Sequence, residues 1–326
     1  MYPFWSLPLA AYSRRGLLGW GTLLTWLKVT PPTRDPLWTR APMLFFTALE
    51  GHVVQADLSD CVERFYYFVG RHPDLQLHLC LSALLAAGDR FIDVGAHIGM
   101  LSLSASARVG PTGEVLAFEP NPINMFRLRR IADLNGRSNI RLFDCALSAS
   151  AGQATFNLPL RAATRGSLQA TAGHEKTMRL PVQMERGDTV LAGLDARPTL
   201  MKVDVEGFEI PVMEGCLEFV DRNRPAMITE CFGPNFAQSG ATVSQFLDVM
   251  SRTGAKGFLL QTSKVRLREP ELLLTPLDAV PIAYFETHCA DLLWLFEDTP
   301  MWQRAGRWIQ AERHAPAEGR TPGGSG

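Results

Sequence analysis

The sequence lacks a surplus of charge of either sign, a long apolar run and a closely spaced cysteine pair. Its 32 lysine and arginine residues nearly equal its 33 aspartate and glutamate residues, so it lacks the basic excess of a dedicated nucleic-acid binder. No apolar run approaches the roughly 20 residues that a membrane-spanning helix needs. The six cysteines form no Cys-x-x-Cys pair, and no histidine stands at metal-ligand spacing from them. These absences favour a soluble protein of the reducing cytoplasm.

Apolar and aromatic residues, by contrast, are abundant. Of the 326 residues, 46% are hydrophobic, and they include 18 Phe, 7 Trp and 5 Tyr. A chain of this length and composition can bury one large core or two smaller ones, without disulfides or a metal. We therefore expect a globular protein, and its size favours an enzyme.

The charge is unevenly distributed along the chain. Residues 1–40 hold five basic side chains and one acidic side chain, which leaves 27 basic and 32 acidic residues for the remainder. Within this segment, apolar residues at steps of three and four predict an amphipathic helix: Leu17, Trp20, Leu24 and Leu27. This helix could make a weak contact with a membrane surface or a partner. Packing on the main domain is the simpler interpretation, and we favour it.

From residue 89 onward, strand-like and helix-like segments alternate. Apolar strands are predicted at 91–95, 114–120, 139–147, 198–207 and 225–232, with helices between them. The helix between the last two strands has Ile210, Met213, Leu217 and Val220 on one face. Strands that are apolar throughout and alternate with helices predict an α/β fold, with a parallel sheet covered by helices on both faces. The carboxyl ends of such strands share one edge, where open α/β sheets bind ligands.

The remaining segments complete the predicted organisation. Residues 1–85 form a partly helical, aromatic N-terminal extension, 86–300 form the main domain, and 301–326 form a disordered tail. Residues 151–184 are predicted as a strand pair around a long loop, which is functional or mobile. Within that loop, Arg165, Ser167 and His174 are available for polar contacts, although a solvated insertion is nearly as plausible. The run Arg127, Arg129 and Arg130 is interpreted as a solvated helix face.

The segment FIDVGAHIG at 91–99 predicts a nucleotide-binding turn. Asp93 ends a buried strand, Gly95 permits a tight turn, and Gly99 lets the next helix approach closely. Glu119 follows 24 residues after Gly95, at the end of the second strand, where a carboxylate can hold both ribose hydroxyls. His97 fills the middle glycine position of the dinucleotide fingerprint, which disfavours a pyrophosphate. The turn therefore favours S-adenosylmethionine, and a nicotinamide-dependent oxidoreductase is the alternative.

Four motifs together resemble the FkbM family of S-adenosylmethionine-dependent methyltransferases. They are DVGAHIG at 93–99, FEPNP at 118–122, CALS at 145–148 and MKVDVEG at 201–207. The resemblance covers about residues 50–298, and the chain departs from the family at His97, usually Asn, and Met100, commonly Tyr. It implies a Rossmann-like class I methyltransferase sheet and transfer of a methyl group to oxygen, on a sugar, polyketide or other metabolite. A non-catalytic binding module with the same fold is the further alternative.

The resemblance also implies positions for the cofactor. Asp93, Gly95 and Ala96 would line the methionine end, beside the Gly99 turn, and Glu119 would bind the ribose. Asn121 would border the adenine side, Asp144 would pair with the adenine amino group, and Ala146 would lie beside the ring. An acid that only caps a turn is the alternative for Asp144.

The segment MKVDVEGFE supplies the candidate catalytic residues. Strand alternation would place Lys202, Asp204 and Glu206 on one side, where either acid could take the proton of a hydroxyl acceptor and Lys202 could tune its charge. Glu230, at the end of the next strand, is a third candidate base. A self-neutralising structural cluster is the alternative. Asp204 and Glu230 could also hold Mg²⁺ through waters, but the resemblance does not require a metal.

Overall fold

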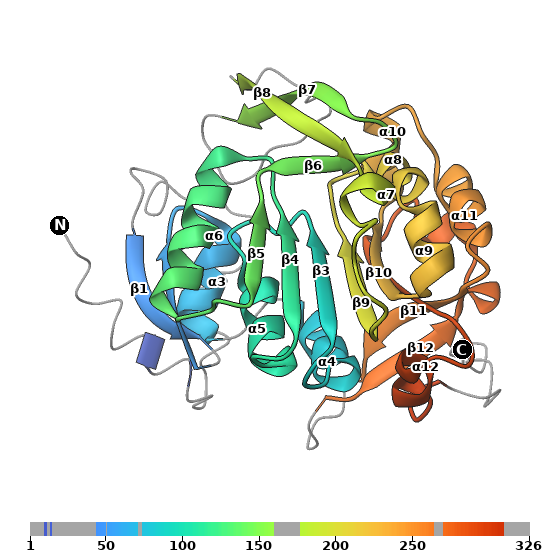
Figure 1. Cartoon of the computed structure of the whole chain (residues 1–326), viewed down its shortest axis with the longest axis horizontal. Coiled ribbons are helices and arrows are strands. Elements are labelled where there is room, and N and C mark those ends of the chain that lie inside the picture. The colour runs from blue at the N-terminus through green and yellow to red at the C-terminus, as the bar shows by residue number, and fades with distance from the viewer. Residues whose placement is uncertain are drawn as a thin grey trace, which may run out of the picture.

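The computed structural model describes residues 10–11, 14, 44–49, 51–70, 74–159, 177–263 and 270–309. The predicted helix over 17–27, most of the polar loop (160–176) and residues 310–326 lie outside these ranges. Within the described residues, one large mixed sheet is flanked by helices, with a hairpin at one side and a small second sheet across one end (Figure 1). No helix of this part of the chain is long and apolar enough to cross a membrane.

The large sheet has a parallel half and an antiparallel half. Its order among the described strands is β12-β11-β13-β10-β9-β3-β4-β5. The parallel strands are β3 (Arg90–Val94), β4 (Glu114–Phe118), β5 (Ile140–Phe143), β9 (Thr199–Val203) and β10 (Ala226–Cys231). The antiparallel strands are β13 (Ala290–Leu295), β11 (Lys256–Thr262) and β12 (Leu272–Pro276). The predicted parallel sheet is therefore confirmed for five strands, and the last three extend it through antiparallel pairings.

Helices cover both faces because successive strand residues point to opposite sides. On one face, Ile92 and Val94 pack with α8 (Glu209–Gly215), α9 (Leu217–Asn223) and α11 (Val243–Ser251). On the other face, Phe91 packs with α4 (Leu75–Leu84) and α5 (Met100–Val109). The remaining helices are α6 (Pro122–Leu134), α7 (Gly187–Val190) and α10 (Gly233–Gln238). The predicted α/β architecture with two covered faces is confirmed.

Two predicted elements are each divided in two. The third predicted strand ends at Phe143, where its ladder with β4 stops, and resumes as β6 (Cys145–Ser148) in another sheet. That sheet has the order β6-β8-β7, with β7 (Gly152–Pro159) and β8 (Thr177–Arg186) as the predicted inserted pair. The single helix predicted before β10 breaks at Cys216 into α8 and α9, and Met213 and Val220 are buried as expected.

The N-terminal region packs against the main domain. The hairpin of β1 (Leu44–Leu49) and β2 (His52–Asp57) is followed by helix α3 (Cys61–Val69), whose sequence CVERFYYFV is rich in aromatic residues. Its buried Glu63 forms an ion pair with Arg127 of α6, with 2.6 Å between the Glu63 Oε2 and Arg127 Nη2 atoms. Arg127 is therefore not part of a solvated face, whereas Arg129 and Arg130 are exposed.

The described chain also continues in ordered form past residue 300. Helix α12 (Pro300–Ala305) buries Met301 and Ala305 against α4, and Arg304 contacts the carboxylate of Asp89. Ile309 forms a bridge with Leu274 of β12. The predicted disordered tail from residue 301 is wrong for residues 301–309, because their apolar side chains close the open edge of the core.

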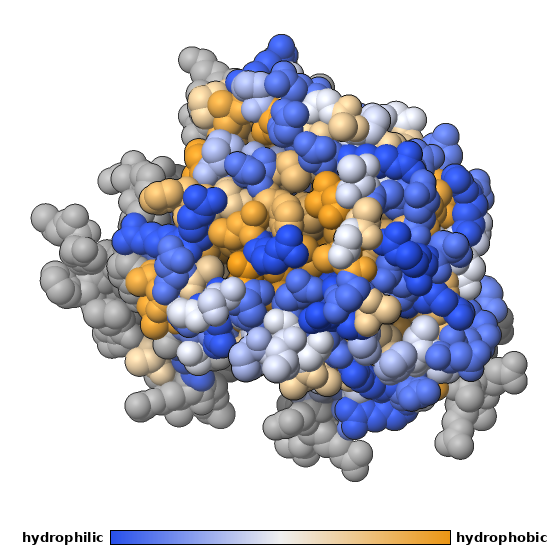
Figure 2. Space-filling model, in the orientation of Figure 1, coloured by the Kyte–Doolittle hydropathy of each residue, from blue (hydrophilic) through white to orange (hydrophobic). Residues whose placement is uncertain are grey.

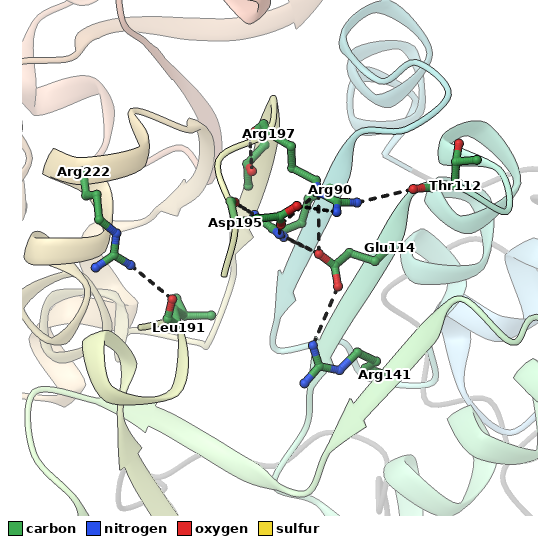
Figure 3. Close-up of polar contacts among 9 residues, drawn as sticks. Arg90, Thr112, Glu114, Arg141, Leu191, Asp195, Arg197 and Arg222 are labelled. Carbon is green, nitrogen blue, oxygen red and sulfur yellow. Dashed lines mark hydrogen bonds and ion pairs between the residues drawn. The ribbon is translucent and has the colours of Figure 1, made fainter. Parts of the chain in front are cut away.

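Charged residues concentrate at the two ends of the parallel strands. At the amino ends, Arg90 bonds the carboxylates of Glu114 and Asp195, and Arg197 and Arg141 flank the same two acids (Figure 3). On the face shown in Figure 2, hydrophobic residues gather in the middle and hydrophilic residues surround them. The carboxyl ends carry a second set of charged residues, which border a cavity.

Candidate active site

A cavity of about 420 Å³ lies at the carboxyl ends of the parallel strands. This volume falls within the range of small-molecule sites. Its walls include the ends of β3, β4, β9 and β10, together with residues of the N-terminal region. The position is the one predicted from the strand pattern.

The turn after β3 depends on glycine. Gly95 has a φ of +79°, and a Cβ atom there would lie 2.0 Å from the backbone oxygen of Asp204. Gly99 has a φ of +86°, and a Cβ atom there would lie 2.7 Å from Leu128 Cγ, so Gly99 lets α6 approach the start of α5. His97, at a φ of 53°, is a non-glycine residue in the left-handed region. Gly95 thus lines the cavity and permits the tight turn, whereas Gly99 lies outside the cavity lining and lets α6 approach closely.

Asp93 and Lys202 form the floor of the cavity. Asp93 is 1% exposed, and its Oδ2 accepts a hydrogen bond of 2.6 Å from Ser102. Its Oδ1 has no hydrogen-bond partner among the described residues. Lys202 Nζ donates to the Gly95 carbonyl at 2.8 Å and lies 3.5 Å from Asp93 Oδ1 and 3.3 Å from Asp204 Oδ2. Burial lowers the pKa of Lys202, but the two aspartates outweigh it, so the net shift is upward and Lys202 stays charged.

Glu119 lies directly after β4 and is 5% exposed. Its Oε2 accepts a bond of 2.7 Å from the His97 amide, and its Oε1 accepts one of 2.9 Å from the Asn121 amide. Burial raises the pKa of Glu119 to about 7, and the two amides and Lys202 oppose that shift. The Asn124 side chain is a third hydrogen-bond donor to Glu119, and the carboxylate lines the cavity, where ligand hydroxyls can approach it.

The predicted adenine side is only partly assembled. Ala146 lines the cavity with its neighbours Cys145 and Leu147. Asn121 is buried as the cap of α6, where its side chain accepts a bond of 3.0 Å from the Ile123 amide, and it does not line the cavity. Asp144 is exposed and also lies outside the lining, so the structure does not bring it to the predicted position.

The predicted catalytic residues converge on the cavity, but strand alternation does not place them. Strand β9 ends at Val203, so Asp204 and Glu206 lie in the following loop, and Glu206 has a φ of 55°. Buried Glu209 holds this loop by accepting bonds from the Val205 and Gly207 amides at 2.9 and 3.3 Å. Burial raises the pKa of Glu209 to about 7. The alternation argument fails because it extended a strand past its last ladder pair.

Glu230, near the end of β10, faces the same cavity as Asp204 and Glu206. The side-chain nitrogen of Asn235 lies 3.1 Å from the Oε2 atoms of both Glu206 and Glu230. Cys289 Sγ donates to Glu230 Oε1 at 3.1 Å. Burial, followed by the charges of Asp204 and Glu206, raises the pKa of Glu230 to about 9. Glu230 therefore carries a proton at neutral pH.

Sequence reasoning missed one wall of the cavity. Residues of α3, α4 and the loops before them contribute to it, and so do Phe156 of β7 and Phe208; the N-terminal contributors are Asp60, Val62, Tyr66, Asp74 and Leu77. The aromatic character of α3 was the one available signal, but it carries no positional information. Within the described residues, His, Cys, Asp and Glu side chains form no group of three that could hold a metal ion.

Comparison with known proteins adds a family match. Residues 93–260 match the family model of the methyltransferase FkbM domain. Methyltransferase sdnD of Sordaria araneosa is 30% identical over 162 residues, covering 41% of this chain and 62% of that protein. Hexuronic acid methyltransferase AglP of Haloferax volcanii is 32% identical over 123 residues, covering 38% of this chain and 48% of that protein. This chain thus spans less than two thirds of the length of either relative.

Solved structures give a weaker likeness. The methyltransferase FkbM of Methylobacillus flagellatus is 17% identical, with 63% of this chain and 43% of that chain aligned and a TM-score of 0.38. A score this low carries no argument about the site. The family match rests on sequence and on the motifs that surround the cavity.

Proposed function

This chain belongs to the FkbM methyltransferase family, and we propose that it transfers the methyl group of S-adenosylmethionine to a hydroxyl oxygen of a sugar or another small metabolite. S-adenosylmethionine supplies a methyl group on a cationic sulfur, which leaves as the neutral thioether S-adenosylhomocysteine. The acceptor oxygen forms the new bond to carbon, the carbon–sulfur bond breaks, and the hydroxyl proton passes to a carboxylate of the chain.

The position of Glu119 carries the proposal. A buried carboxylate directly after the second strand, at the wall of the cavity, can accept hydrogen bonds from ribose hydroxyls. Gly95 keeps the turn close to the Asp204 backbone, because a Cβ atom there would lie 2.0 Å from the Asp204 backbone oxygen. Asp93 is buried, its Oδ1 lies 3.5 Å from Lys202 Nζ, and its negative charge suits the ammonium group of the methionine end. These features fit an adenosine ligand that carries an amino acid.

Asp204 is the candidate base. Lys202 Nζ lies 3.3 Å from its Oδ2, and Asp204 lines the cavity beside Glu206 and Glu230. Glu230, with its pKa raised to about 9, holds a proton at neutral pH and is suited to donate a hydrogen bond instead. Glu206 lines the same wall, and Lys202 positions Asp204. A Mg²⁺ ion between Asp204 and Glu230 stays an untested alternative.

The expected cytoplasmic location and the expected sugar acceptor are also part of the proposal. The cysteines that the structure describes are free: Cys80, Cys145, Cys216, Cys231 and Cys289. Free thiols are compatible with the expected cytoplasmic location. The relative that methylates hexuronic acid supports a sugar as one class of acceptor. Contact of residues 1–40 with a membrane surface or a partner stays a prediction.

A calorimetric titration of the full chain tests the cofactor. We expect S-adenosylhomocysteine to bind in the micromolar range and NAD not to bind. Glu119→Ala should weaken the former by about a hundredfold, because two hydrogen bonds to a charged group are lost. Glu218→Ala, on the exposed side of α9, is the matched control and should bind normally. Tight NAD binding, or no binding of either ligand, would overturn the proposal in favour of an oxidoreductase or a binding module.

A turnover assay then tests the base. Once a screen of hydroxylated acceptors has identified a substrate, Asp204→Asn should keep its affinity for S-adenosylhomocysteine and lose most of its turnover, about a hundredfold or more. Full turnover of this variant would exclude Asp204 as the base and direct attention to Glu206 and Glu230.

A further inference from the structure

Helix α5 carries two buried serines on one face. Ser102 and Ser106 are four residues apart, so they lie above one another on the helix, and they are 0% and 1% exposed. Their neighbours in the helix belong to the hydrophobic core of this side of the sheet: Leu101, Ala105 and Val109. A hydroxyl group in such surroundings is costly unless it forms a hydrogen bond. Each serine therefore needs a partner, and the two partners differ.

Ser102 forms its bond with a side chain of the cavity. Its Oγ donates to Asp93 Oδ2 at 2.6 Å, and Asp93 belongs to β3 and lines the cavity. A serine inside a helix can instead return its hydroxyl to a backbone carbonyl of the preceding turn. Ser82 of α4 does this, since it donates to the His78 carbonyl at 2.8 Å. The hydroxyl of Ser102 thus connects α5 with the end of a strand.

Ser106 forms a bond of the same length away from the cavity. Its Oγ donates to Asn139 Oδ1 at 2.6 Å, and Asn139 directly precedes β5, at the amino ends of the parallel strands. Neither serine is among the described residues that line the cavity, and Asn139 is not among them either. Ser102 can therefore act on a ligand through Asp93, whereas the bond of Ser106 leads to the opposite end of the sheet.

The bond of Ser102 fixes how the Asp93 carboxylate is turned. Asp93 is 1% exposed, and its two oxygens have different neighbours. Oδ2 accepts the hydrogen bond from Ser102, and Oδ1 lies 3.5 Å from Lys202 Nζ. The terminal torsion of an aspartate is broad, so the side chain alone does not determine the plane of its carboxylate. A hydroxyl on one oxygen and an ammonium group near the other determine it here.

We infer that Ser102 is a positioning residue for the cofactor, and that its hydroxyl holds the Asp93 carboxylate in the orientation that receives the ammonium group of S-adenosylmethionine. This inference rests on the proposed function, which assigns that ammonium group to Asp93. Hydrogen bonds between an ammonium group and a carboxylate are directional, and a partner that is already held in place loses less freedom on binding. Ser102 thus raises the affinity for the methionine end of the cofactor without touching it.

Two ligands that differ at this end test the inference on the full chain. S-adenosylhomocysteine carries the amino acid, whereas methylthioadenosine has the same adenosine and thioether but ends in a methyl group. For Ser102→Ala, calorimetry should report about tenfold weaker binding of S-adenosylhomocysteine, because Asp93 loses a hydrogen bond to its charged group. Binding of methylthioadenosine should change by less than about twofold, because this ligand has no group that reaches Asp93. A purely structural loss would weaken both ligands alike.

Ser106→Ala is the matched control. It removes a buried hydroxyl from the same helix and a hydrogen bond of the same 2.6 Å length. Both ligands should bind this variant within about twofold of the unmodified chain, since distant sites act independently. Thermal unfolding of the two variants shows that each is folded and compares their losses of stability.

Three results would overturn the inference. They are an affinity of Ser102→Ala for S-adenosylhomocysteine within about twofold of the unmodified chain, an equal loss for both ligands, and the same loss in Ser106→Ala. If S-adenosylhomocysteine fails to bind the unmodified chain, the proposed function fails. If it binds but Ser102→Ala shows no selective loss, only this inference fails.

Discussion

The parallel strands of the large sheet have charged residues at both of their ends, and the pKa values of the acids are shifted in opposite directions at the two ends. At the amino ends, Arg90 is 0% exposed and bonds both Glu114 and Asp195. Hydrogen bonds from Arg197 and Arg90 lower the pKa of Asp195 to about 2. At the carboxyl ends, burial raises the pKa of Glu119 to about 7 and that of Glu230 to about 9. Arginine side chains balance the acidic charges at the amino ends, whereas the acids at the carboxyl ends outnumber the cations near them.

This difference separates stability from binding. A buried cation that contacts two carboxylates leaves no unsatisfied charge, so the amino-end network closes the base of the sheet (Figure 3). Acids with raised pKa values beside a cavity are typical of functional sites, because a ligand supplies the missing partner. The comparison predicts that changes at the amino end affect the free energy of unfolding, whereas changes at the carboxyl end affect ligand affinity and its pH dependence.

Arg90→Met should have the largest effect. The methionine keeps most of the side-chain volume but removes the hydrogen bonds that buried Arg90 donates to Glu114 and Asp195, so the free energy of unfolding should fall by about 3 kcal/mol. Urea denaturation measures the loss. The folded variant should bind S-adenosylhomocysteine within about twofold of the unmodified chain. A loss below about 1 kcal/mol, or a large loss of affinity, would contradict the division between the two ends.

Glu209 gives the next largest effect, and it depends on pH. Its pKa is about 7 in the folded chain and 4.5 in the unfolded one, so the folded state binds more protons between these values. The stabilising contribution is complete below about pH 4.5 and is lost as the pH rises through 7. Glu209→Gln has no proton to lose, so its free energy of unfolding should fall by about 2 kcal/mol less across this window.

Denaturation of both proteins at several pH values between 4.5 and 7.5 measures this difference. The difference reports Glu209 together with its effect on Glu230, whose pKa the charge of Glu209 also raises. Parallel stability curves would show that Glu209 does not take up a proton in the folded state. The carboxyl end would then resemble the amino end more than its burial suggests.

Sequence reasoning predicted the elements whose signals are local. The apolar strands before Asp93 and Glu119, the glycine turn and the inserted pair of β7 and β8 were confirmed, because period, turn residues and motif spacing specify them directly. The antiparallel pairing of β11, β12 and β13 was not predicted. Strand direction depends on long-range connections, which no local pattern encodes.

Cavity residues that follow the strand ends were predicted, and those from the N-terminal region were not. Glu119, Asp93 and Gly95 belong to one compact motif region, so their proximity follows from adjacent strand ends. Asp74 and Tyr66 reach the cavity from the N-terminal region, and their contribution depends on how α3 and α4 pack on the sheet. The burial of Arg127 was missed for the same reason, since its partner Glu63 is 64 residues away. Asp144 follows β5 as Glu119 follows β4, but it is exposed and does not line the cavity.

Glu119 gives a smaller effect, on affinity. In the free chain its carboxyl group has a pKa of about 7, and it must be ionised to accept the ribose hydroxyls. S-adenosylhomocysteine affinity should therefore rise with pH up to about 7 and level off above it. Below pH 7 it should fall by up to about tenfold per pH unit, or about 1.4 kcal/mol. Glu119→Gln should bind S-adenosylhomocysteine weakly at every pH. Calorimetric titrations of both proteins from pH 5.5 to 8 measure the affinities, and an unmodified chain whose affinity does not change with pH would contradict the prediction.

The smallest effect is expected where charges are paired but exposed. Lys256 and Glu297 lie 2.7 Å apart, with 57% and 53% of their side chains exposed, and they bond across the ends of β11 and β13. Water screens such a pair, so Glu297→Gln should change the free energy of unfolding by less than about 0.5 kcal/mol, and added salt should reduce even that. Denaturation at low and high ionic strength measures it beside Arg90→Met. If the exposed pair contributed as much as the Arg90 network, pairing alone would determine stability. The comparison between the two ends of the sheet requires instead that the loss of a charged partner lowers the free energy of unfolding more when the pair is buried than when it is exposed.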